Sequence, residues 1–316
     1  MNLPIGVVAP PDLPPGDFVR FAREVERLGF AELWVVEDCF LKGGIAQAAV
    51  ALAATARVRV GMGILPAGAR NAAFASMDIS TLSSLFPGRL IVGIGHGMPN
   101  WMRQTGAWPS SPLTLLGEYI SAVKAILSGA NVSTDGKYVA LHDVKLGAPP
   151  TTVPPIYSGV RGPKSMAVSG QVADGTILAE PVTPEYLRVV REQVGVPRSH
   201  HKLAAYNVAA VDDSVERARD LARQSLAWIG DPEWAPHIAA LPFAGEFARL
   251  RAAADSREDF AARLPSDWVD QLAVVGTPAM AKARLSELND AGADHLILIP
   301  AGPDTFASLA SLARLV

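Results

Sequence analysis

Cysteine is almost absent from this chain of 316 residues, in which Cys39 stands alone. A single cysteine excludes a disulfide framework and a zinc site built on thiolates. Charged residues are also scarce: they make up 19% of the sequence, and the formal net charge is −3. This balance argues against the basic surface of a nucleic-acid-binding protein and against a disordered acidic tail.

Long hydrophobic runs are missing as well. The most apolar helical candidate, residues 43–58, is too short and too rich in alanine to span a bilayer, and residues 1–18 lack the features of a signal peptide. We therefore expect a cytoplasmic protein that binds neither membrane nor nucleic acid. The sequence contains no His, Asp and Glu cluster with metal-ligand spacing and no Gly-x-Ser-x-Gly motif, so we expect no metal and no serine nucleophile.

What the chain does have is a regular alternation of strand-like and helix-like segments. Short apolar runs predict strands, because parallel strands buried on both faces read as continuous apolar stretches. The helix that follows the third run is expected to turn Phe74, Met77, Leu82 and Leu85 toward the core. The predicted strands cover residues 3–9, 32–37, 58–65, 89–95, 154–160, 174–179, 202–211 and 295–300.

Eight strands separated by helices favour a closed (β/α)8 TIM barrel. An open dinucleotide-binding sheet is less suitable, because its glycine fingerprint would follow the first strand, whereas the glycine-rich turn here follows the fourth. No break in composition divides the chain, and we expect one domain over residues 1–316. A hairpin inserted at about 131–147 and extra helices at about 214–272, before the last strand, account for the additional length.

Two of the predicted strands end in glycine turns. The fourth leads into residues 91–97, and the fifth into residues 157–165, where a helix opens at Pro163. Such turns expose backbone N–H groups, and a helix N-terminus attracts anions. With Arg161 and Lys164 beside the second turn, the pattern indicates one phosphate-bearing ligand held between both turns; plain turns without a ligand are the alternative.

In five ordered motifs the chain resembles the luciferase-like flavin and deazaflavin oxidoreductase superfamily, and it is most similar to the coenzyme F420-dependent branch. The resemblance covers most of the chain and is weakest around residues 212–265. It implies a barrel with the cofactor in the C-terminal mouth, and a homodimer. The motifs are LWVVED, VGMGILPAGARN, LFPGRLIVGIGHG, PPIYSGVRGPKSMAVSGQVADGTIL and VGTPAMAKARLSELNDAGADHLILIP.

The resemblance also implies which residues hold the cofactor. The third strand of the family ends in a bulge with a non-prolyl cis peptide behind the deazaflavin ring, and the matching bond is Gly63-Ile64. The cofactor tail is expected against the two glycine turns, with cationic side chains meeting its phosphate or acidic groups. The residues implied are Gly95, His96, Gly97, Val160, Arg161, Gly162 and Lys164.

Two departures from the pattern limit what can be transferred. Family members that act on glucose 6-phosphate carry Asp-His at the end of the second strand, where this chain has Asp38-Cys39. They also carry a glutamate after the glycines of the fourth strand, where this chain has Met98. A sugar-phosphate dehydrogenase is therefore not expected, and the family's acid–base assignment cannot be copied.

Four residues are candidates for proton transfer. Glu37 and Asp38 end the second strand and Glu180 ends the sixth, at the end of a barrel where catalytic side chains gather. His96 lies within a glycine turn and titrates near neutrality when it is unperturbed. Structural roles are the alternative for each: a loop cap, an ion pair in the mouth, or a satisfied histidine.

These features favour an F420-dependent oxidoreductase that moves hydride between the deazaflavin and a small organic substrate. An FMN-dependent luciferase-like monooxygenase is the alternative. The long acidic tail of F420 needs a positive groove, whereas FMN needs one phosphate site, so Arg161 with Lys164 favours F420. A non-catalytic flavin-binding barrel and a barrel isomerase for a phosphorylated sugar are the alternatives from other classes.

Overall fold

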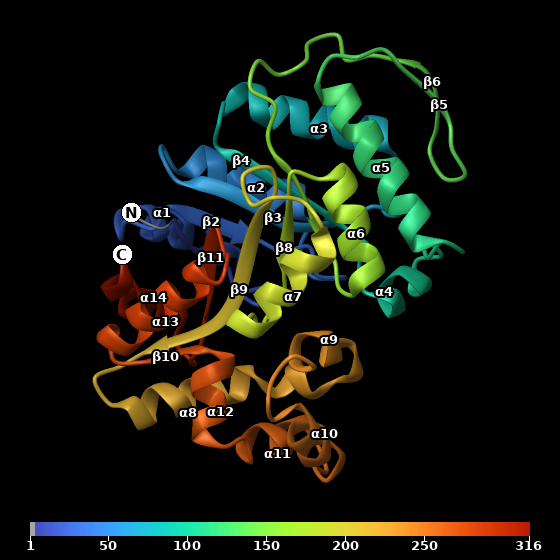
Figure 1. The fold of residues 1–316 in the computed structure, drawn as a ribbon. Helices are drawn as coiled ribbons and strands as arrows, with labels where there is room; N and C mark the ends of the chain where they lie inside the picture. Colours follow the sequence, from blue (N-terminus) through green and yellow to red (C-terminus); the bar gives the residue numbers. More distant parts are fainter. Residues whose placement is uncertain (1–3) are drawn as a thin grey trace.

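The computed structural model describes residues 4–316, and eight parallel strands within them close into a barrel (Figure 1). Each strand pairs with the next around the ring, and β11 pairs with β1 to complete it. The predicted (β/α)8 fold is therefore confirmed. The barrel strands are β1 (Ile5–Val8), β2 (Glu32–Val35), β3 (Arg59–Pro66), β4 (Leu90–Gly95), β7 (Ile156–Gly159), β8 (Gly175–Leu178), β9 (Lys202–Val211) and β11 (His295–Pro300).

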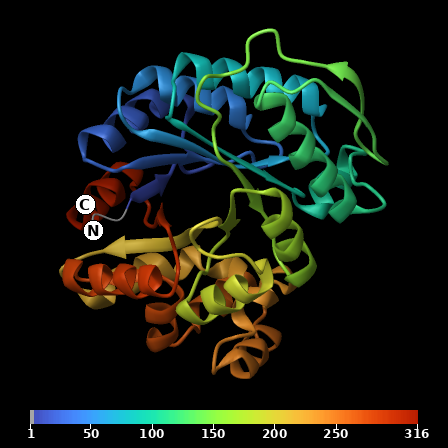
Figure 2. The same ribbon diagram turned by 45° about the horizontal axis from the view of Figure 1, so that its top comes forward.

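Helices cover the outside of the barrel in both views (Figures 1 and 2). The helix over residues 18–27 illustrates how the sequence forms these elements. Phe21 and Val25 are buried at helical spacing, and Gly29 follows the helix with a φ of 92° that favours glycine. These helices are η1 (Pro15–Asp17), α1 (Phe18–Arg27), α2 (Gly44–Ala54), α3 (Ala72–Leu85), α4 (Pro99–Gln104), α5 (Pro112–Leu127), α6 (Pro163–Val172), α7 (Pro184–Val194), α13 (Pro278–Asp290), α14 (Thr305–Leu312) and η4 (Ala313–Leu315).

The hairpin stands where the sequence predicted it. It consists of β5 (Val132–Asp135) and β6 (Ala140–Val144), which pair antiparallel. The Glu118 carboxylate of α5 accepts the backbone N–H groups of three consecutive residues in the hairpin turn, 137–139, at 2.8–3.0 Å. This one carboxylate thus fixes the hairpin to the barrel's outer layer.

The extra helices also lie where the sequence predicted them, between β9 and the last strand. We call residues 215–272 the helical cap; they gather on one side of the barrel in both views (Figures 1 and 2). The cap surrounds an apolar cluster of its own, which meets the barrel through Val208 and Ala210 of β9. Its elements are α8 (Val215–Ser225), η2 (Ala227–Gly230), η3 (Pro232–Trp234), α9 (Ala235–Ile238), α10 (Ala244–Ala252), α11 (Arg257–Ala262) and α12 (Ser266–Leu272).

One strand was not expected from the sequence. β10 (Val274–Gly276) follows the cap directly and pairs in parallel with the end of β9, outside the closed ring. With three residues it is too short to stand out from the helical pattern on either side. The sequence interpretation therefore ran from the cap straight into α13.

The expected inward face of α3 was wrong. Phe74, Met77 and Leu85 are 67%, 53% and 66% exposed, and of the four side chains expected in the core only Leu82 is buried. The helix instead rests on the barrel through mostly small residues, which permit a close approach. That inner face consists of Ala72, Ala75, Ser76, Ile79, Ser80, Leu82 and Ser83.

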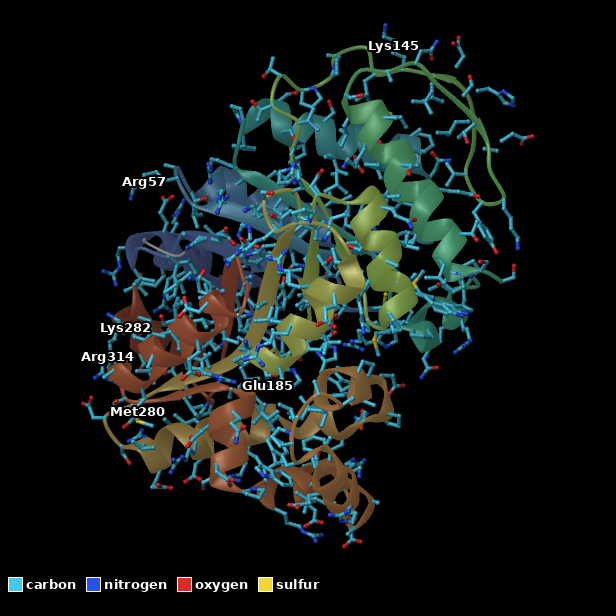
Figure 3. All side chains as sticks on the ribbon, viewed as in Figure 1. Arg57, Lys145, Glu185, Met280, Lys282 and Arg314 are labelled. Carbon is cyan, nitrogen blue, oxygen red and sulfur yellow. The ribbon has the colours of Figure 1, made fainter. Side chains whose placement is uncertain are left out.

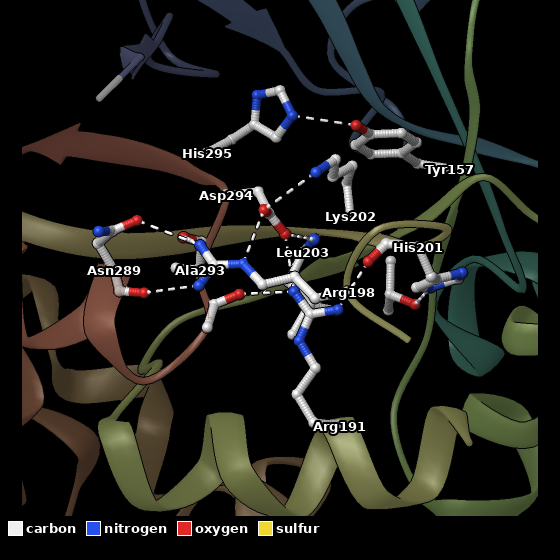
Figure 4. A network of polar contacts seen from close by, with 12 residues as sticks. Tyr157, Arg191, Arg198, His201, Lys202, Leu203, Asn289, Ala293, Asp294 and His295 are labelled. Carbon is white, nitrogen blue, oxygen red and sulfur yellow. Dashed lines mark hydrogen bonds and ion pairs between the residues drawn. The ribbon is translucent and has the colours of Figure 1, made fainter. Parts of the chain in front are cut away.

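The amino ends of the strands, opposite the mouth, are held by ion pairs. Asp294, just before β11, accepts hydrogen bonds from Arg191 at 2.7 Å, from Arg198 at 3.0 Å and from the N–H of Leu203 at 2.9 Å (Figure 4). Burial alone would raise the pKa of Asp294, but these donors outweigh it and lower the pKa. The contacts connect α7, β9 and the chain entering β11.

A second network at the same end is buried except for Arg59, whose side chain is 39% exposed. Glu32, the first residue of β2, accepts hydrogen bonds from Trp34 and His295 at 2.8 Å each and pairs with Arg59. His295 contacts the Tyr157 hydroxyl at 3.0 Å. The floor of the barrel is therefore polar but paired, as a buried charge requires.

Most other charges lie on the periphery, as the labelled Arg57, Lys282 and Arg314 illustrate (Figure 3). Among residues 4–316 no helix is long and apolar enough to cross a membrane.

Candidate active site

The two glycine turns lie side by side at the carboxyl ends of the strands. β4 and β7 are neighbours, and their register places Gly95 opposite Gly159. The turns that follow these residues therefore share one edge of the mouth, which a ligand contacting both of them requires.

The glycines in these turns serve two purposes. A Cβ on Gly95 would lie 2.4 Å from the Gly159 carbonyl oxygen, and a Cβ on Gly159 would lie 2.3 Å from Cγ2 of Ile64. Both positions thus lack side chains because the Ile64 side chain and the neighbouring strand fill that space. Gly162, by contrast, has a φ of 78° and nothing within 4 Å of an added Cβ, so its backbone is open to a ligand.

The bulge implied for the third strand is present. The register between β3 and β4 shifts between Met62 and Leu65, and the Gly63-Ile64 peptide bond is cis. A Cβ on Gly63 would lie 2.1 Å from the hydroxyl oxygen of Tyr206 on β9. The bulge therefore reaches across the barrel interior to the opposite strand.

His96 joins the two turns. Its Nε2 lies 3.1 Å from the Ser165 hydroxyl in the first turn of α6, and burial lowers the pKa of the imidazole. No side chain caps the N-terminus of α6, and Lys164 stands exposed in its first turn. The free N–H groups of this helix end and the lysine together suit an anion.

Two carboxyl groups, Asp38 and Glu180, lie in the mouth. Burial raises the pKa of both, and the charge of Asp38 raises that of Glu180 further, whereas Arg161 opposes the rise. The charges of Asp38 and Arg161 thus both act on Glu180. A carboxyl group that keeps its proton to higher pH can donate it to a substrate.

Glu37 lies in a different environment from Asp38. Its carboxylate forms a two-pronged ion pair with Arg70, at 2.6 and 2.7 Å, and accepts the N–H of Gly44 at 2.7 Å. These contacts fix the loop after β2 to the loop after β3 and to the start of α2. Glu37 and Asp38 are thus adjacent in sequence but separate in role, and the structure supports Asp38 as the acid–base candidate of the pair.

A cleft of about 540 Å³ opens at the rim, between the loop after β3 and the loop before α5. Arg70, Asn71, Trp108 and Tyr119 line it, and neither Asp38 nor Glu180 does. Asn71 caps α3 by accepting the N–H of Ala73 at 2.8 Å. The cleft is therefore distinct from the mouth, in which the candidate proton donors lie.

The Arg161 side chain is directed toward the cap. Its guanidinium carbon lies 4.2 Å from the centre of the Trp234 ring, and the titratable groups that affect its pKa are Glu180, Tyr186 and Glu233. Burial lowers the pKa of Arg161, and these three groups oppose that effect. Arg161 and Lys164 thus lie on the same loop and helix start, but the Arg161 guanidinium lies under the cap whereas Lys164 is exposed.

Several polar side chains near Arg161 escaped the sequence interpretation. The Tyr186 hydroxyl, the Trp234 Nε1 and the His237 Nε2 are buried and have no hydrogen-bond partner among the described residues, and the same is true of the Asn207 side-chain nitrogen. The only available signal was Asn207, a polar residue within an apolar run. The sequence around Tyr186 and His237 gave no signal of a functional role, because both residues lie in helices without a recognisable motif.

The fold defines a TIM-barrel protein, and its candidate ligand site lies at the carboxyl ends of the strands. Residues 3–295 match the model of the luciferase-like monooxygenase family, and the chain belongs to that family. Within residues 4–316 no group of three His, Cys, Asp or Glu side chains could hold a metal ion.

Individual relatives are similar over nearly the whole chain. The 5,10-methylenetetrahydromethanopterin reductase of Methanolobus tindarius is 27% identical over 95% of this chain and 95% of its own length. The F420-dependent glucose-6-phosphate dehydrogenase of Amycolatopsis mediterranei is 29% identical over 92% of this chain and 90% of its own. The solved coenzyme F420-dependent tetrahydromethanopterin reductase of Methanopyrus kandleri superposes with a TM-score of 0.81 at 20% identity, covering 100% of this chain and 99% of that one.

Proposed function

We propose that the protein is a coenzyme F420-dependent oxidoreductase that transfers hydride between the deazaflavin and a small organic substrate. The observation that carries the proposal is the uncapped N-terminus of α6, open at Gly162 and flanked by Lys164, directly beside the turn of β4. This donor set fits a phosphate with an acidic tail beyond it. The F420-dependent relatives, similar over most of the chain, support the same cofactor.

The residues proposed to bind the cofactor fall into two groups. Gly63 and Ile64 would contact the deazaflavin ring system. His96, Gly97, Val160, Gly162 and Lys164 would hold the phosphate and tail, with Gly95 and Arg161 contributing backbone to the same turns. When bound, F420 supplies or accepts the hydride at its C5.

The remaining groups of the mouth act on the substrate. Asp38 and Glu180 hold the proton that accompanies the hydride, because burial favours their protonated forms. The cap lies beside this end and keeps water from the reacting groups.

The cofactor is tested by titrating the purified protein with F420 and with FMN and following fluorescence quenching. Tight F420 binding with weak FMN binding supports the proposal, and the reverse affinities would overturn it in favour of an FMN-dependent monooxygenase. A sugar-phosphate isomerase would bind neither, and a binding-only barrel would hold F420 without turnover.

A pair of lysine variants makes the test specific. Lys164→Gln should weaken F420 binding by about 1.5–3 kcal/mol, the contribution of a hydrogen bond to a charged group. Lys145→Gln is the matched control, because Lys145 lies at the outer edge near the hairpin (Figure 3) and should not alter binding. Equal F420 affinities of the two variants would remove the α6 N-terminus from the site.

We further propose that the protein is a homodimer joined through the outer faces of α2 and α3. α2 contains no charged residue and α3 only Asp78, whereas half of the residues of α1 are charged. The exposed Phe74, Met77 and Leu85 stand on this surface, on which Asp78 is the one charged residue of the two helices. An apolar surface of this kind on two adjacent helices suits a second copy related by a twofold axis, which pairs the same face with itself.

Two methionines allow a matched test of this surface. Met77 of α3 and Met280 of α13 are 53% and 40% exposed, and only Met77 lies on the proposed interface. Sedimentation equilibrium should give a dimer for the wild type and for Met280→Asp, and a monomer for Met77→Asp. A monomeric wild type, or a dimeric Met77→Asp variant, would contradict the interface.

The single-domain organisation over residues 1–316 and the cytoplasmic location remain predictions. The first is supported by the cap's apolar cluster, which includes side chains of β9 and so shares a strand with the barrel.

A further inference from the structure

Arg161 is a partly buried cation whose hydrogen-bonding capacity is unused. A guanidinium carries five N–H donors, and among residues 4–316 none of them forms a hydrogen bond or an ion pair. Its pKa is affected at longer range by the carboxyl groups of Glu180 and Glu233 and by the neutral phenol of Tyr186. The guanidinium nitrogens keep some contact with solvent, so a ligand that enters the mouth can replace water as their acceptor.

The ring of Trp234 holds this guanidinium in place. The 4.2 Å separation between the guanidinium carbon and the ring centre is typical of a cation–π contact. Trp234 is 8% exposed, so the ring is fixed by the cap around it. An aromatic ring offers no hydrogen-bond acceptor in its plane, so this contact leaves the N–H groups of Arg161 available for a ligand.

Polar atoms without partners surround the same place. Nδ1 of the fully buried His237 lies 3.3 Å from the Pro181 carbonyl oxygen, to which it can only donate, so its Nε2 is an acceptor without a donor. The Tyr186 ring lies 4.4 Å from the His237 ring, and its hydroxyl also has no partner. Native proteins leave few buried polar atoms unpaired. Here three of them, the His237 Nε2, the Tyr186 hydroxyl and the Trp234 Nε1, lie near Arg161, which has no partner among the described residues.

The charges of the mouth leave this cation uncompensated. Burial raises the pKa of both Asp38 and Glu180, which favours their neutral forms. Arg161 and Glu180 influence each other's pKa but form no ion pair, so a gap remains between them. Glu233 is exposed, and water screens its charge.

We propose that Arg161, backed by Trp234, binds a carboxylate of the substrate beneath the helical cap and beside Glu180, so that the protein acts on an organic acid. A carboxylate matches the two-pronged geometry of a guanidinium edge. This inference rests on the proposed F420-dependent function, and it names the class of substrate. It also separates the two cations of the loop: Lys164 contacts the cofactor, and the Arg161 side chain contacts the substrate.

The test uses acids paired with their amides, which have nearly the same shape but no charge. Acetate, benzoate and 3-phenylpropionate, and the corresponding amides, are titrated calorimetrically into the full-length protein with and without F420. At least one acid should bind about tenfold or more tightly than its amide, and Arg161→Gln should abolish that preference. F420 affinity should be unchanged in Arg161→Gln and weakened in Lys164→Gln.

Arg257 provides a matched control for the arginine substitution. Its guanidinium also stacks on a tryptophan, at 3.8 Å from Trp228, but it is paired with Asp231 at the exposed side of the cap. Arg257→Gln should therefore keep the preference for acids. The wild-type comparison of acid with amide stands even where Arg161→Gln proves unstable, and Trp234→Phe adds a second variant that should weaken acid binding.

The inference is overturned if no acid binds better than its amide, or if Arg161→Gln keeps the preference. It is also overturned if Arg161→Gln loses F420 affinity as Lys164→Gln does, because Arg161 would then be a cofactor ligand. Failure of the proposed function has a different signature: F420 does not bind, while the acid titration without F420 still reports on Arg161.

Discussion

Replacing Gly63 with alanine tests how tightly the mouth is built around β3. The added Cβ would lie 2.1 Å from the Tyr206 hydroxyl oxygen, more than 1 Å short of the 3.4 Å at which ordinary contact begins. The tyrosine ring cannot simply retreat, because it packs edge-on against the buried Trp34 with ring centres 5.7 Å apart. We expect Gly63→Ala to lower the free energy of unfolding by about 1–3 kcal/mol, as overpacking in a core does.

The second substitution isolates the cause. Tyr206→Phe removes the hydroxyl oxygen, and this hydroxyl is buried without a partner, so we expect no loss of stability and a gain of up to about 1 kcal/mol. In the double variant the nearest ring atom to the new Cβ is then Cζ, at 3.1 Å. The penalty of Gly63→Ala should therefore fall by at least about 1 kcal/mol when it is combined with Tyr206→Phe.

Urea unfolding of the four proteins of this double-mutant cycle measures the coupling directly. Additive effects would refute the reasoning, because they would show that the hydroxyl contact does not cause the loss. The matched change Gly162→Ala, at a position with open space around it, should show no dependence on the presence of the Tyr206 hydroxyl.

Three further predictions use the buried charges. Glu180→Gln should be more stable than the wild type near neutral pH and should lose this advantage below pH 4.5. Because burial raises the pKa of Glu180 in the folded state, the wild type loses stability as the pH rises above the ordinary value of 4.5. Equal melting temperatures of variant and wild type at both pH values would contradict this prediction. Glu32→Gln should lower the free energy of unfolding by about 3–5 kcal/mol near neutral pH, since it leaves His295 and Arg59 without their carboxylate. Burial would raise the pKa of Glu32, but its hydrogen-bond and ion-pair partners lower it overall. The difference in unfolding free energy between Glu32→Gln and the wild type, measured by urea titration, should therefore shrink as the pH falls below 4.5. A constant difference would argue against the ion pair. Asp294→Asn should lower the free energy of unfolding by about 3 kcal/mol. It should leave F420 affinity unchanged, because the Asp294 network lies at the amino ends of the strands. A matching loss of F420 affinity would contradict this prediction and show that the two ends of the barrel are coupled.

The barrel could be predicted because its signal is repeated. All eight barrel strands are apolar runs, and every turn between a barrel strand and the following helix contains glycine or proline, except the turn after β9. β10 could not be predicted, because a three-residue strand is stabilised by its pairing with β9 rather than by a pattern of its own. Local sequence preference therefore describes the ring well and the pairing outside it poorly.

The orientation of α3 shows a different limit. Phe74 and Met77 are the larger apolar side chains of this helix, and hydrophobicity alone assigns them to the core. The structure buries Ala72 and Ser76 instead, because small residues bring the helix close to the strands. A helix with apolar residues on two faces cannot be oriented from its own sequence, since the choice depends on what each face meets.

The candidate site was predictable in its backbone but not in its side chains. The glycine turns and the Gly63-Ile64 bond follow from ordered motifs. The separation of Glu37 from Asp38, and of Arg161 from Lys164, depends on partners distant in sequence: Arg70 for the first pair and Trp234 for the second. No spacing rule relates those residues, so only the folded chain could assign them.

The apolar cluster of the cap has a consequence for how new specificities could arise. Because residues 215–272 are built around side chains largely their own, this segment can accumulate substitutions, or be exchanged with that of a homologue, without rebuilding the strands beneath it. The cofactor turns lie on other loops and would be carried along unaltered. A chimera made at the ends of β9 and β10 should thus inherit its redox chemistry from one parent and its choice of reactant from the other.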